Sequence, residues 1–166
     1  MYKALFSSIL FLPIFLHAQD KKALDSIDKV VIAQIITPAE QQAARQNQPP
    51  AWDEMTKEIT AKYSATEADR AVTKARIYFY YGKDWALFSA ALVHYTTAYE
   101  DKEDLRLMNK NATYVLQHST NPEEWKTARG WVKHAVDKEP SNATYKATYD
   151  ALTEKIIRNK ATNISQ

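Results

Sequence analysis

The stretch W-K-T-A-R-G-W-V-K-H-A-V-D-K-E-P-S-N-A-T-Y, residues 125–145, decides the fold class of this chain. Its apolar positions recur at helical spacing and are Trp125, Ala128, Val132, Ala135 and Val136. The small side chains at positions 128 and 135 allow a neighbouring helix to approach closely. Pro140-Ser141-Asn142 then stops this helix and starts another, because proline fixes the backbone of the turn. The stretch therefore predicts one helix of a hairpin, a turn, and the start of the next helix.

Similar apolar stripes predict an all-α chain of six helices, with a seventh near the N-terminus. The six cover residues 52–62, 66–82, 85–99, 105–118, 122–138 and 142–158. Several residues mark helix starts. Asp84 can cap one helix, and Asn121-Pro122-Glu123-Glu124 starts another. Thr66 and Asp69 have the spacing of a capping box.

The short loops between these helices predict antiparallel neighbours. Successive hairpins would span residues 66–99 and 103–138, and residues 142–158 would form an unpaired closing helix. The expected architecture is a short α-solenoid of antiparallel helical hairpins.

The region before residue 51 is less regular. Apolar residues at positions 24, 27, 31 and 35 predict a helix over residues 22–36, although Val30-Val31-Ile32 also has the character of a strand. Residues 37–50 are polar and end in two prolines, which predicts a linker with room for a short helix in its middle. The expected division is an N-terminal helix plus linker at 19–50, a helical domain at 51–158 and a disordered polar tail at 159–166.

Residues 1–18 have the pattern of a secretory signal peptide. Lys3 precedes an apolar stretch from Ala4 to Leu16, and Ala18 offers the small residue found before a cleavage site. A membrane anchor is the alternative, but the run is short for a span of roughly 20 residues and Pro13 interrupts it. A lipid-modified cysteine is excluded because the chain has no cysteine. We expect a periplasmic or secreted protein with no membrane span after signal cleavage.

The composition excludes several classes of function. The absence of cysteine removes disulfides, thiol redox chemistry and cysteine-ligated zinc. Only two residues are glycine, Gly82 and Gly130, which disfavours tight β-hairpins and phosphate-binding loops. The net charge is +2 and the signs are mixed along the chain. Nucleic-acid binding is therefore not supported.

Residues 121–145 resemble a tetratricopeptide repeat, a helical hairpin that stacks into binding scaffolds. Ala128, Val132, Ala135 and Pro140 follow the Ala…Phe…Ala…Pro order of that family, with valine in place of phenylalanine. Residues 103–118 lack the family's W-x2-L-G-x2-Y pattern in the first helix. The resemblance implies a scaffold that binds a protein or peptide partner.

A second resemblance covers about residues 50–155. The segment Y-Y-G-K-D-W-A-L-F-S-A-A-L-V-H-Y at 80–95, followed by 105–150, is similar to the helical C-terminal region of certain bacterial envelope proteins of the thioredoxin family. The thioredoxin domain and its C-x-x-C motif are absent. The resemblance therefore implies a helical architecture and an envelope location, and no redox activity.

No residue pattern predicts catalysis, a metal site or a cofactor. His94, His118 and His134 fall on three consecutive predicted helices and are the candidates for a metal site. No pair has the i, i+4 spacing of a helical zinc site. The acidic clusters stand at predicted helix starts, where carboxylates favour the helix dipole. A serine nucleophile motif of the G-x-S-x-G type does not occur.

Two observations point to a binding surface. Tyr78, Tyr80 and Tyr81 cannot all face the core from one helix, so some are expected on a groove where the ring suits peptide or glycan contact. In stacked hairpins the first helix of each pair builds the concave face. Register from Pro140 places six residues on that face: Lys110, Thr113, Gln117, Thr144, Glu154 and Lys155. Lys110 and Lys155 are the candidates for holding a peptide carboxylate.

The expected function is that of an exported, non-catalytic interaction module that binds a peptide or an envelope protein in a helical groove. The alternative is a structural remnant of a thioredoxin-like envelope protein, in which residues 142–158 dock on a second copy. An enzyme of unknown type is the third possibility.

Overall fold

The computed structural model describes residues 27–164, and every regular element in this part of the chain is helical. Residues 27–31 are helical and lead into a series of labelled elements. These are η1 (Ile32–Ile36), α2 (Thr37–Arg45), α3 (Trp52–Lys62), α4 (Ala65–Tyr80), α5 (Trp85–Tyr99), α6 (Leu105–His118), α7 (Pro122–Lys138) and α8 (Ala143–Ile164). The all-α class is therefore confirmed, whereas the predicted leader at 1–18 lies outside the described residues.

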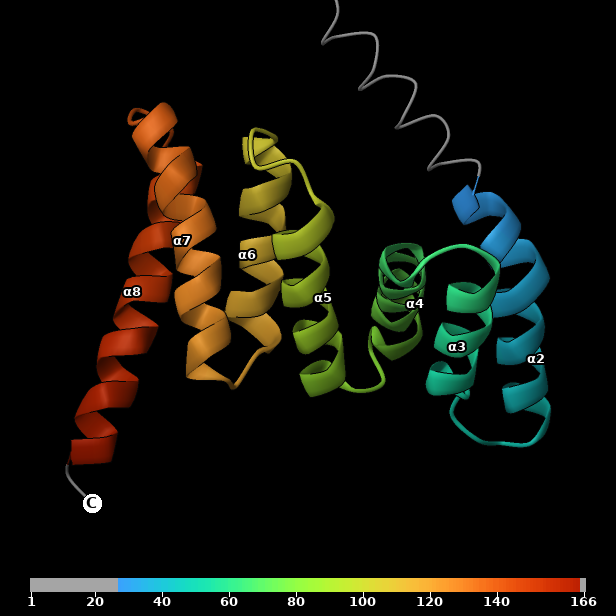
Figure 1. Cartoon of the computed structure of the whole chain (residues 1–166). Coiled ribbons are helices and arrows are strands. Elements are labelled where there is room, and N and C mark those ends of the chain that lie inside the picture. Colours follow the sequence, from blue (N-terminus) through green and yellow to red (C-terminus); the bar gives the residue numbers. More distant parts are fainter. Residues whose placement is uncertain (1–26, 165–166) are drawn as a thin grey trace, which may run out of the picture.

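The helices stand side by side in chain order, from α2 at one end to α8 at the other (Figure 1). From α3 to α8 the most extensive contacts are between consecutive helices, as expected for antiparallel hairpins. Additional contacts join α5 to α7 and α6 to α8, so the last four helices form two layers. Among the described helices, no comparable contact joins α4 to α6. Part of α5 is therefore left uncovered between α4 and α6.

Polar side chains cap the starts of the helices. Asp84 and Asp104 each accept a hydrogen bond from the backbone N–H three residues later, at 2.9 Å. Asn121 caps α7 by accepting from the N–H of Glu123 at 3.0 Å, and Asn142 caps α8 by accepting from the N–H of Thr144 at 3.1 Å. These bonds satisfy N–H groups that have no partner inside the helix. They confirm the predicted starts of α5, α7 and α8.

The predicted capping box of α4 is wrong. Ser64, which has an extended backbone, accepts a hydrogen bond from the N–H of Glu67 at 3.1 Å and donates one to the Glu67 carboxylate at 2.8 Å. The Ser-x-x-Glu spacing at 64–67 thus competes with Thr66-x-x-Asp69 and begins the helix earlier. Asp69 is left free to bond other elements.

The N-terminal region is more helical than its polar composition predicts. Residues 37–45, expected to belong to the linker, form α2, and only 46–51 connect α2 to α3. The π-helical turn η1 lets Ile35 and Ile36 both be buried beneath it. A π turn adds one residue to the helical period, so the apolar stripe that begins at Val31 stays on the packed side.

Two apolar cores hold the fold together. In the larger one, Val115, Val132 and Leu152 from α6, α7 and α8 are completely buried. Ala128 and Ala135 are completely buried there too, which confirms that they lie where helices approach closely. The smaller core joins residues 27–36 to α3 and α4. Trp52 packs against both cores and so connects them.

The C-terminal helix closes the larger core with a polar outer face. α8 continues to Ile164, so residues 159–164 extend the helix instead of forming the predicted tail. Its exposed side carries the ion pairs Lys146–Asp150 and Glu154–Arg158, each four residues apart. Such a charged face is typical of the terminal helix that shields a solenoid core from water.

Candidate functional site

A groove of about 400 Å³ lies over α4, α5 and α6. Phe88 and Leu92 of α5 are buried and form its floor. Its walls come from α4 and α6, which contact each other far less than either contacts α5. The volume lies within the range of ordinary ligand sites. The groove therefore results from how the hairpins stack, because α5 packs on both α4 and α6, whereas these two helices pack little on each other.

The three tyrosines at positions 78, 80 and 81, at and just after the end of α4, have different roles. Tyr80 is only 9 % exposed, and its hydroxyl accepts a hydrogen bond from Trp52 Nε1 at 2.9 Å. Tyr78 and Tyr81 are 73 % and 53 % exposed and both line the groove. The sequence argument that not all three can face the core is thus confirmed. The helical period sends position 80 inward and leaves positions 78 and 81 on the groove side.

Aromatic contacts hold one end of the groove in shape. Tyr81 at the C-terminal cap of α4, Phe88 of α5 and Tyr114 of α6 meet edge to face, with ring centroids 5.5 to 6.2 Å apart. His118 stacks on Trp85 with the centroids 3.6 Å apart and continues the cluster beyond the groove. Edge-to-face pairs contribute roughly 0.5–1.5 kcal/mol each beyond area burial. These contacts within the protein therefore fix the shape of this end of the groove without a ligand.

The groove carries charged groups on its rim. Lys74 of α4 lies 4.0 Å from the buried carboxylate of Asp28. Lys110 of α6 lies on the opposite wall and makes no ion pair or hydrogen bond with another residue in 27–164. Glu100, which follows α5, also lines the groove. An exposed lysine beside an apolar floor offers a positive charge to an incoming group.

Two smaller hollows extend the groove along the molecule. One, of about 120 Å³, shares Lys74 and Tyr78 with the groove and continues toward η1. The other, of about 350 Å³, shares Lys110 and Tyr114 and continues along α6. The three hollows therefore form one surface that crosses from the N-terminal helix to α6.

The structure brings together three of the six residues predicted for the concave face. Lys110, Thr113 and Gln117 line the hollow on α6 next to Tyr114. Thr144 and Glu154 lie on α8, where Glu154 pairs with Arg158. Neither residue lines any of the three hollows described above, and α8 packs on α6 and α7.

Lys155 has a structural role in place of the predicted ligand contact. Its Nζ donates to the backbone carbonyls of Leu116 at 2.6 Å and Ser119 at 3.2 Å, at the C-terminal end of α6. The ammonium also lies 4.6 Å from the ring centre of Trp125. Burial lowers the pKa of Lys155. A cation in this position satisfies carbonyls that the helix leaves without partners, so it is not available to a ligand.

Lys74, Tyr95 and Tyr114 also line the groove, although they were not predicted from the sequence. Tyr114 stands four positions after Lys110 and so lies on the same face of α6, a signal that was present in the sequence. Lys74 and Tyr95 had no such signal. They belong to helices whose relative rotation depends on tertiary packing.

The three histidines lie in separate surroundings and do not form a shared site. His94 contacts Asp69 of α4 at 2.7 Å, and His134 contacts Glu103 at 3.1 Å. His118 stacks on Trp85. Within residues 27–164, no cluster of three or more His, Asp or Glu side chains has the geometry to hold a metal.

Asp69, predicted to belong to a capping box, instead connects α4 to α5. Its carboxylate accepts hydrogen bonds from the Tyr99 hydroxyl and from His94. Burial alone would raise the pKa of Asp69, but the hydrogen bonds from Tyr99 and His94 outweigh burial and lower it. The ionised carboxylate is therefore the form that the folded state stabilises.

We expect the free energy of unfolding to fall as the pH rises from about 10 to about 12. Burial raises the pKa of Tyr95 to about 12; burial and the hydrogen bond to Asp69 raise that of Tyr99 to about 12. Both phenols titrate near 10 in an unfolded chain. Because the folded pKa is the higher one, the stabilisation is complete below pH 10 and is lost as the pH approaches 12. Urea unfolding followed by circular dichroism over this range measures the decline.

The variant Tyr99→Phe provides the control for this decline. It removes one of the two ionisations, so the dependence on pH should become shallower while the variant stays folded. An unchanged slope in a variant that carries both Tyr95→Phe and Tyr99→Phe would contradict the assignment.

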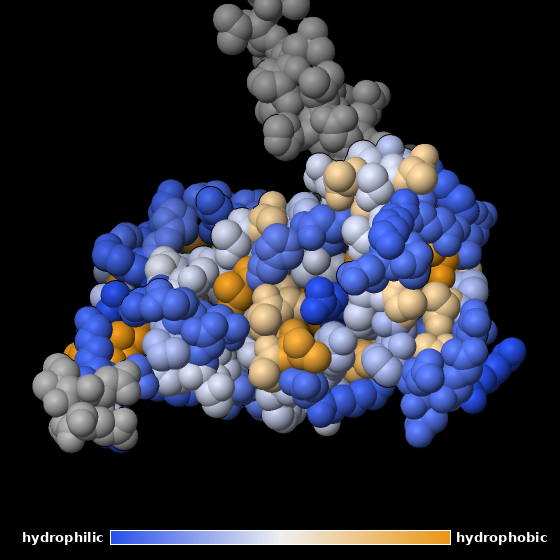
Figure 2. All heavy atoms as spheres, turned by 60° about the horizontal axis from the view of Figure 1, so that its bottom comes forward, coloured by the Kyte–Doolittle hydropathy of each residue, from blue (hydrophilic) through white to orange (hydrophobic). Residues whose placement is uncertain are grey.

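None of the helices within residues 27–164 has the length and apolar character needed to cross a bilayer. Hydrophilic side chains surround the apolar ones on the face shown in Figure 2.

Searches against known proteins add no assignment. No protein-family model, curated protein or solved structure matches the chain.

Proposed function

We propose that this protein is an exported, non-catalytic interaction module of the tetratricopeptide-like kind, which binds a peptide segment of a partner in the groove over α4, α5 and α6. The observation that carries the proposal is the groove itself, with an apolar floor, the exposed Tyr78 and Tyr81 on one wall and the half-buried Tyr114 on the other. Exposed aromatic side chains over a prebuilt hollow are the usual anchors of a binding surface.

The charges of the groove agree with a protein ligand. Lys110 has no partner among the described residues. On the opposite wall, the ammonium of Lys74 lies 4.0 Å from the carboxylate of Asp28. A peptide that brings an acidic group to Lys110 would gain a hydrogen-bonded ion pair next to an apolar floor. Lys110 thus keeps its predicted role of holding a peptide carboxylate, and Lys74 replaces Lys155 as the second lysine of the site.

The proposed location is the periplasm or the extracellular space. It rests on the leader pattern of residues 1–18 and on the resemblance to bacterial envelope proteins. A partner in the cell envelope follows from this location.

A structural, self-associating role is less well supported. The outward side of α8 was the surface expected to dock on a second copy, and it carries the paired charges Lys146–Asp150 and Glu154–Arg158. Interfaces between obligate copies are depleted of charge at their centre.

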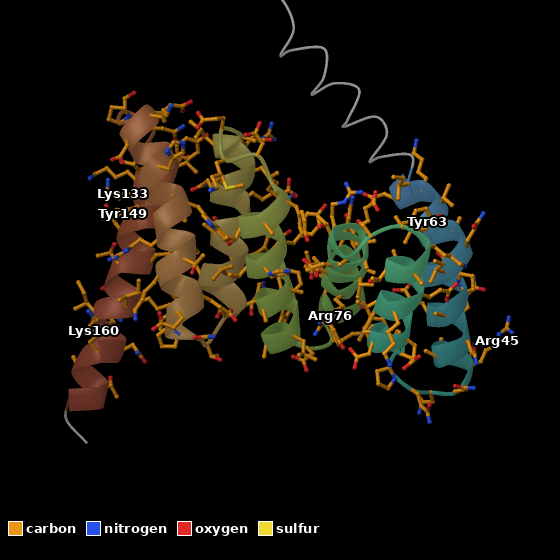
Figure 3. The ribbon with its side chains drawn as sticks, in the orientation of Figure 1. Arg45, Tyr63, Arg76, Lys133, Tyr149 and Lys160 are labelled. Carbon is orange, nitrogen blue, oxygen red and sulfur yellow. The ribbon has the colours of Figure 1, made fainter. Side chains whose placement is uncertain are left out.

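Site-specific photocross-linking tests the proposal. A benzophenone amino acid replaces Tyr78, which is 73 % exposed on the groove, or Tyr63, which is 37 % exposed. Tyr63 lies near α2 and α3, remote from α5 and α6 (Figure 3). Because both changes replace one exposed aromatic ring with another, the two variants form a matched pair. The protein is expressed with its leader in the native envelope and irradiated.

We expect one dominant heterologous partner from position 78 and not from position 63, with the product lost in the additional variant Lys110→Glu. Equal products from both positions would refute the groove. Products that contain only a second copy of this chain would favour the self-associating alternative.

A further inference from the structure

The surface formed by the three hollows carries two unpaired charges of opposite sign. Lys110 lies where the groove meets the hollow along α6, and it has no partner among residues 27–164. Glu40, in the first turn of α2, lines the smaller hollow on the other side of the groove. The Glu40 side chain makes no hydrogen bond or ion pair with another residue in the same part of the chain. The surface therefore presents an available carboxylate and an available ammonium, with the groove between them.

The other charged groups that line the hollows already have partners. The carboxylate of Asp28 lies 2.8 Å from the guanidinium of Arg70 and 4.0 Å from the ammonium of Lys74. Glu100 also interacts with another part of the protein. Among the described acidic side chains on this surface, Glu40 alone is therefore left to meet a charge from a ligand.

Glu40 is half-buried beside apolar side chains, including those of Ile36 and Ala71. Burial raises the pKa of Glu40, and the positive charge of Lys83 only partly opposes this rise. The ammonium of Lys83 lies over the ring of Phe79, 4.0 Å from its centre, and forms no ion pair with Glu40. A cation from a ligand would supply the partner that this carboxylate lacks. Their attraction would be less screened there than at an exposed site.

The hollow beside Glu40, of about 120 Å³, suits one long basic side chain. Lysine and arginine combine an apolar stem with a charged tip. The stem would pack on Ile32 and Ile36, and the tip would reach Glu40. Tyr78, which is 73 % exposed, lines both this hollow and the groove. The rest of a bound segment can therefore continue over Tyr78 toward Lys110.

We propose that the ligand of this surface is a peptide segment with opposite charges at its two ends. A lysine or arginine enters the hollow at Glu40, an aspartate or glutamate pairs with Lys110, and apolar residues between them cover the floor of the groove. This inference rests on the proposed function and specifies the charge pattern of the bound segment. A uniformly acidic segment would place a like charge against Glu40, and a uniformly basic one would do so against Lys110.

Isothermal titration calorimetry on residues 19–166, which include every described residue, tests the proposal. The probes are synthetic peptides with acetylated and amidated ends, so that their charges come from side chains alone. Each peptide carries one lysine and one glutamate, separated by a spacer of leucine, alanine and serine in a short, a medium and a long version. Two further forms of each replace the lysine with norleucine, which keeps the aliphatic stem, or the glutamate with glutamine.

We expect saturable binding of the peptide whose spacing matches the surface. Norleucine should weaken it about tenfold, because Glu40 is half-buried, and glutamine about threefold, because Lys110 is exposed. Glu40→Gln should remove the first difference and leave the second, and Lys110→Gln should do the reverse. Glu54→Gln is the matched control and should change neither, because Glu54 pairs with Lys57 on α3 and lines none of the three hollows.

The same Glu40→Gln variant tests whether Glu40 stabilises the fold. Burial disfavours the ionised carboxylate, and the change breaks no ion pair within residues 27–164. We therefore expect the free energy of unfolding at neutral pH to be unchanged or higher in the variant. Urea unfolding followed by circular dichroism measures it. A clear decrease would assign Glu40 to the fold and overturn its role in binding.

The outcomes distinguish this inference from the function on which it rests. Equal affinity for the lysine and norleucine peptides, or a preference for lysine that survives Glu40→Gln, would overturn the charge pattern and leave a peptide groove in place. Failure of the peptides at all three spacings would overturn it as well. A cross-link from position 78 would then preserve the proposed function, and its absence would overturn both proposals.

Discussion

Replacement of Trp125 by alanine should lower the free energy of unfolding by about 3–5 kcal/mol, the largest effect we expect from a single change in this chain. Trp125 is 6 % exposed in the larger core, and its Nε1 donates to the carbonyl of Ser119 at 3.0 Å. The ammonium of Lys155 also lies over its ring. Alanine would leave a cavity among α6, α7 and α8 and remove the surface against which Lys155 packs. Urea unfolding followed by far-ultraviolet circular dichroism measures the loss.

The variant Trp125→Phe separates packing from hydrogen bonding. It keeps most of the ring volume and loses the indole N–H, so we expect a smaller loss of about 1–2 kcal/mol. The Ser119 carbonyl retains Lys155 Nζ as a donor at 3.2 Å. Equal losses for phenylalanine and alanine would show that the hydrogen bond, rather than the filled volume, stabilises this junction.

Replacement of Trp52 by alanine should uncouple the smaller core from the larger one, at a cost of about 2–3 kcal/mol because the ring is only partly buried. Trp52 meets Phe79 edge to face with the centroids 5.5 Å apart and donates Nε1 to the Tyr80 hydroxyl. It is the residue that packs against both cores. We expect the helices before residue 62 to open more often while α6 to α8 remain closed. Hydrogen exchange read by mass spectrometry locates the change.

The matched variant for this prediction is Tyr80→Phe. It removes only the hydroxyl that accepts from Trp52, so we expect a loss of about 1 kcal/mol and little uncoupling. Exchange that accelerates equally in both halves of Trp52→Ala would mean that the chain unfolds as one unit and that Trp52 is not its junction.

Asp28 adds a polar connection to this N-terminal unit. Its carboxylate lies 2.8 Å from the guanidinium of Arg70 on α4, and both side chains are nearly buried. A buried pair of this kind selects one docking position for residues 27–31 on α4, since any shift would leave charges without partners. The sequence contained no signal for this pair, because the two residues are far apart in the chain.

Local sequence determined the helices and most of their boundaries. Apolar residues at helical spacing, asparagine or aspartate before the first turn, and Pro122 or Pro140 at the turns each act within a few residues, so they could be recognised without the fold. The errors at the helix ends have local causes as well. Ser64 with Glu67 competed successfully with Thr66 and Asp69, and α2 and the end of α8 are helical despite their polar composition.

The groove was decided by the tertiary structure. The sequence alone indicated that Tyr78 and Tyr81 are exposed and that Lys110, Thr113 and Gln117 share one face, since these relations depend only on the helical period. It could not show that α8 packs on α6 while α4 stays apart from it. That difference arises from side-chain packing between helices far apart in the chain, which moves Lys155 into the end of α6 and opens the groove over α5 instead.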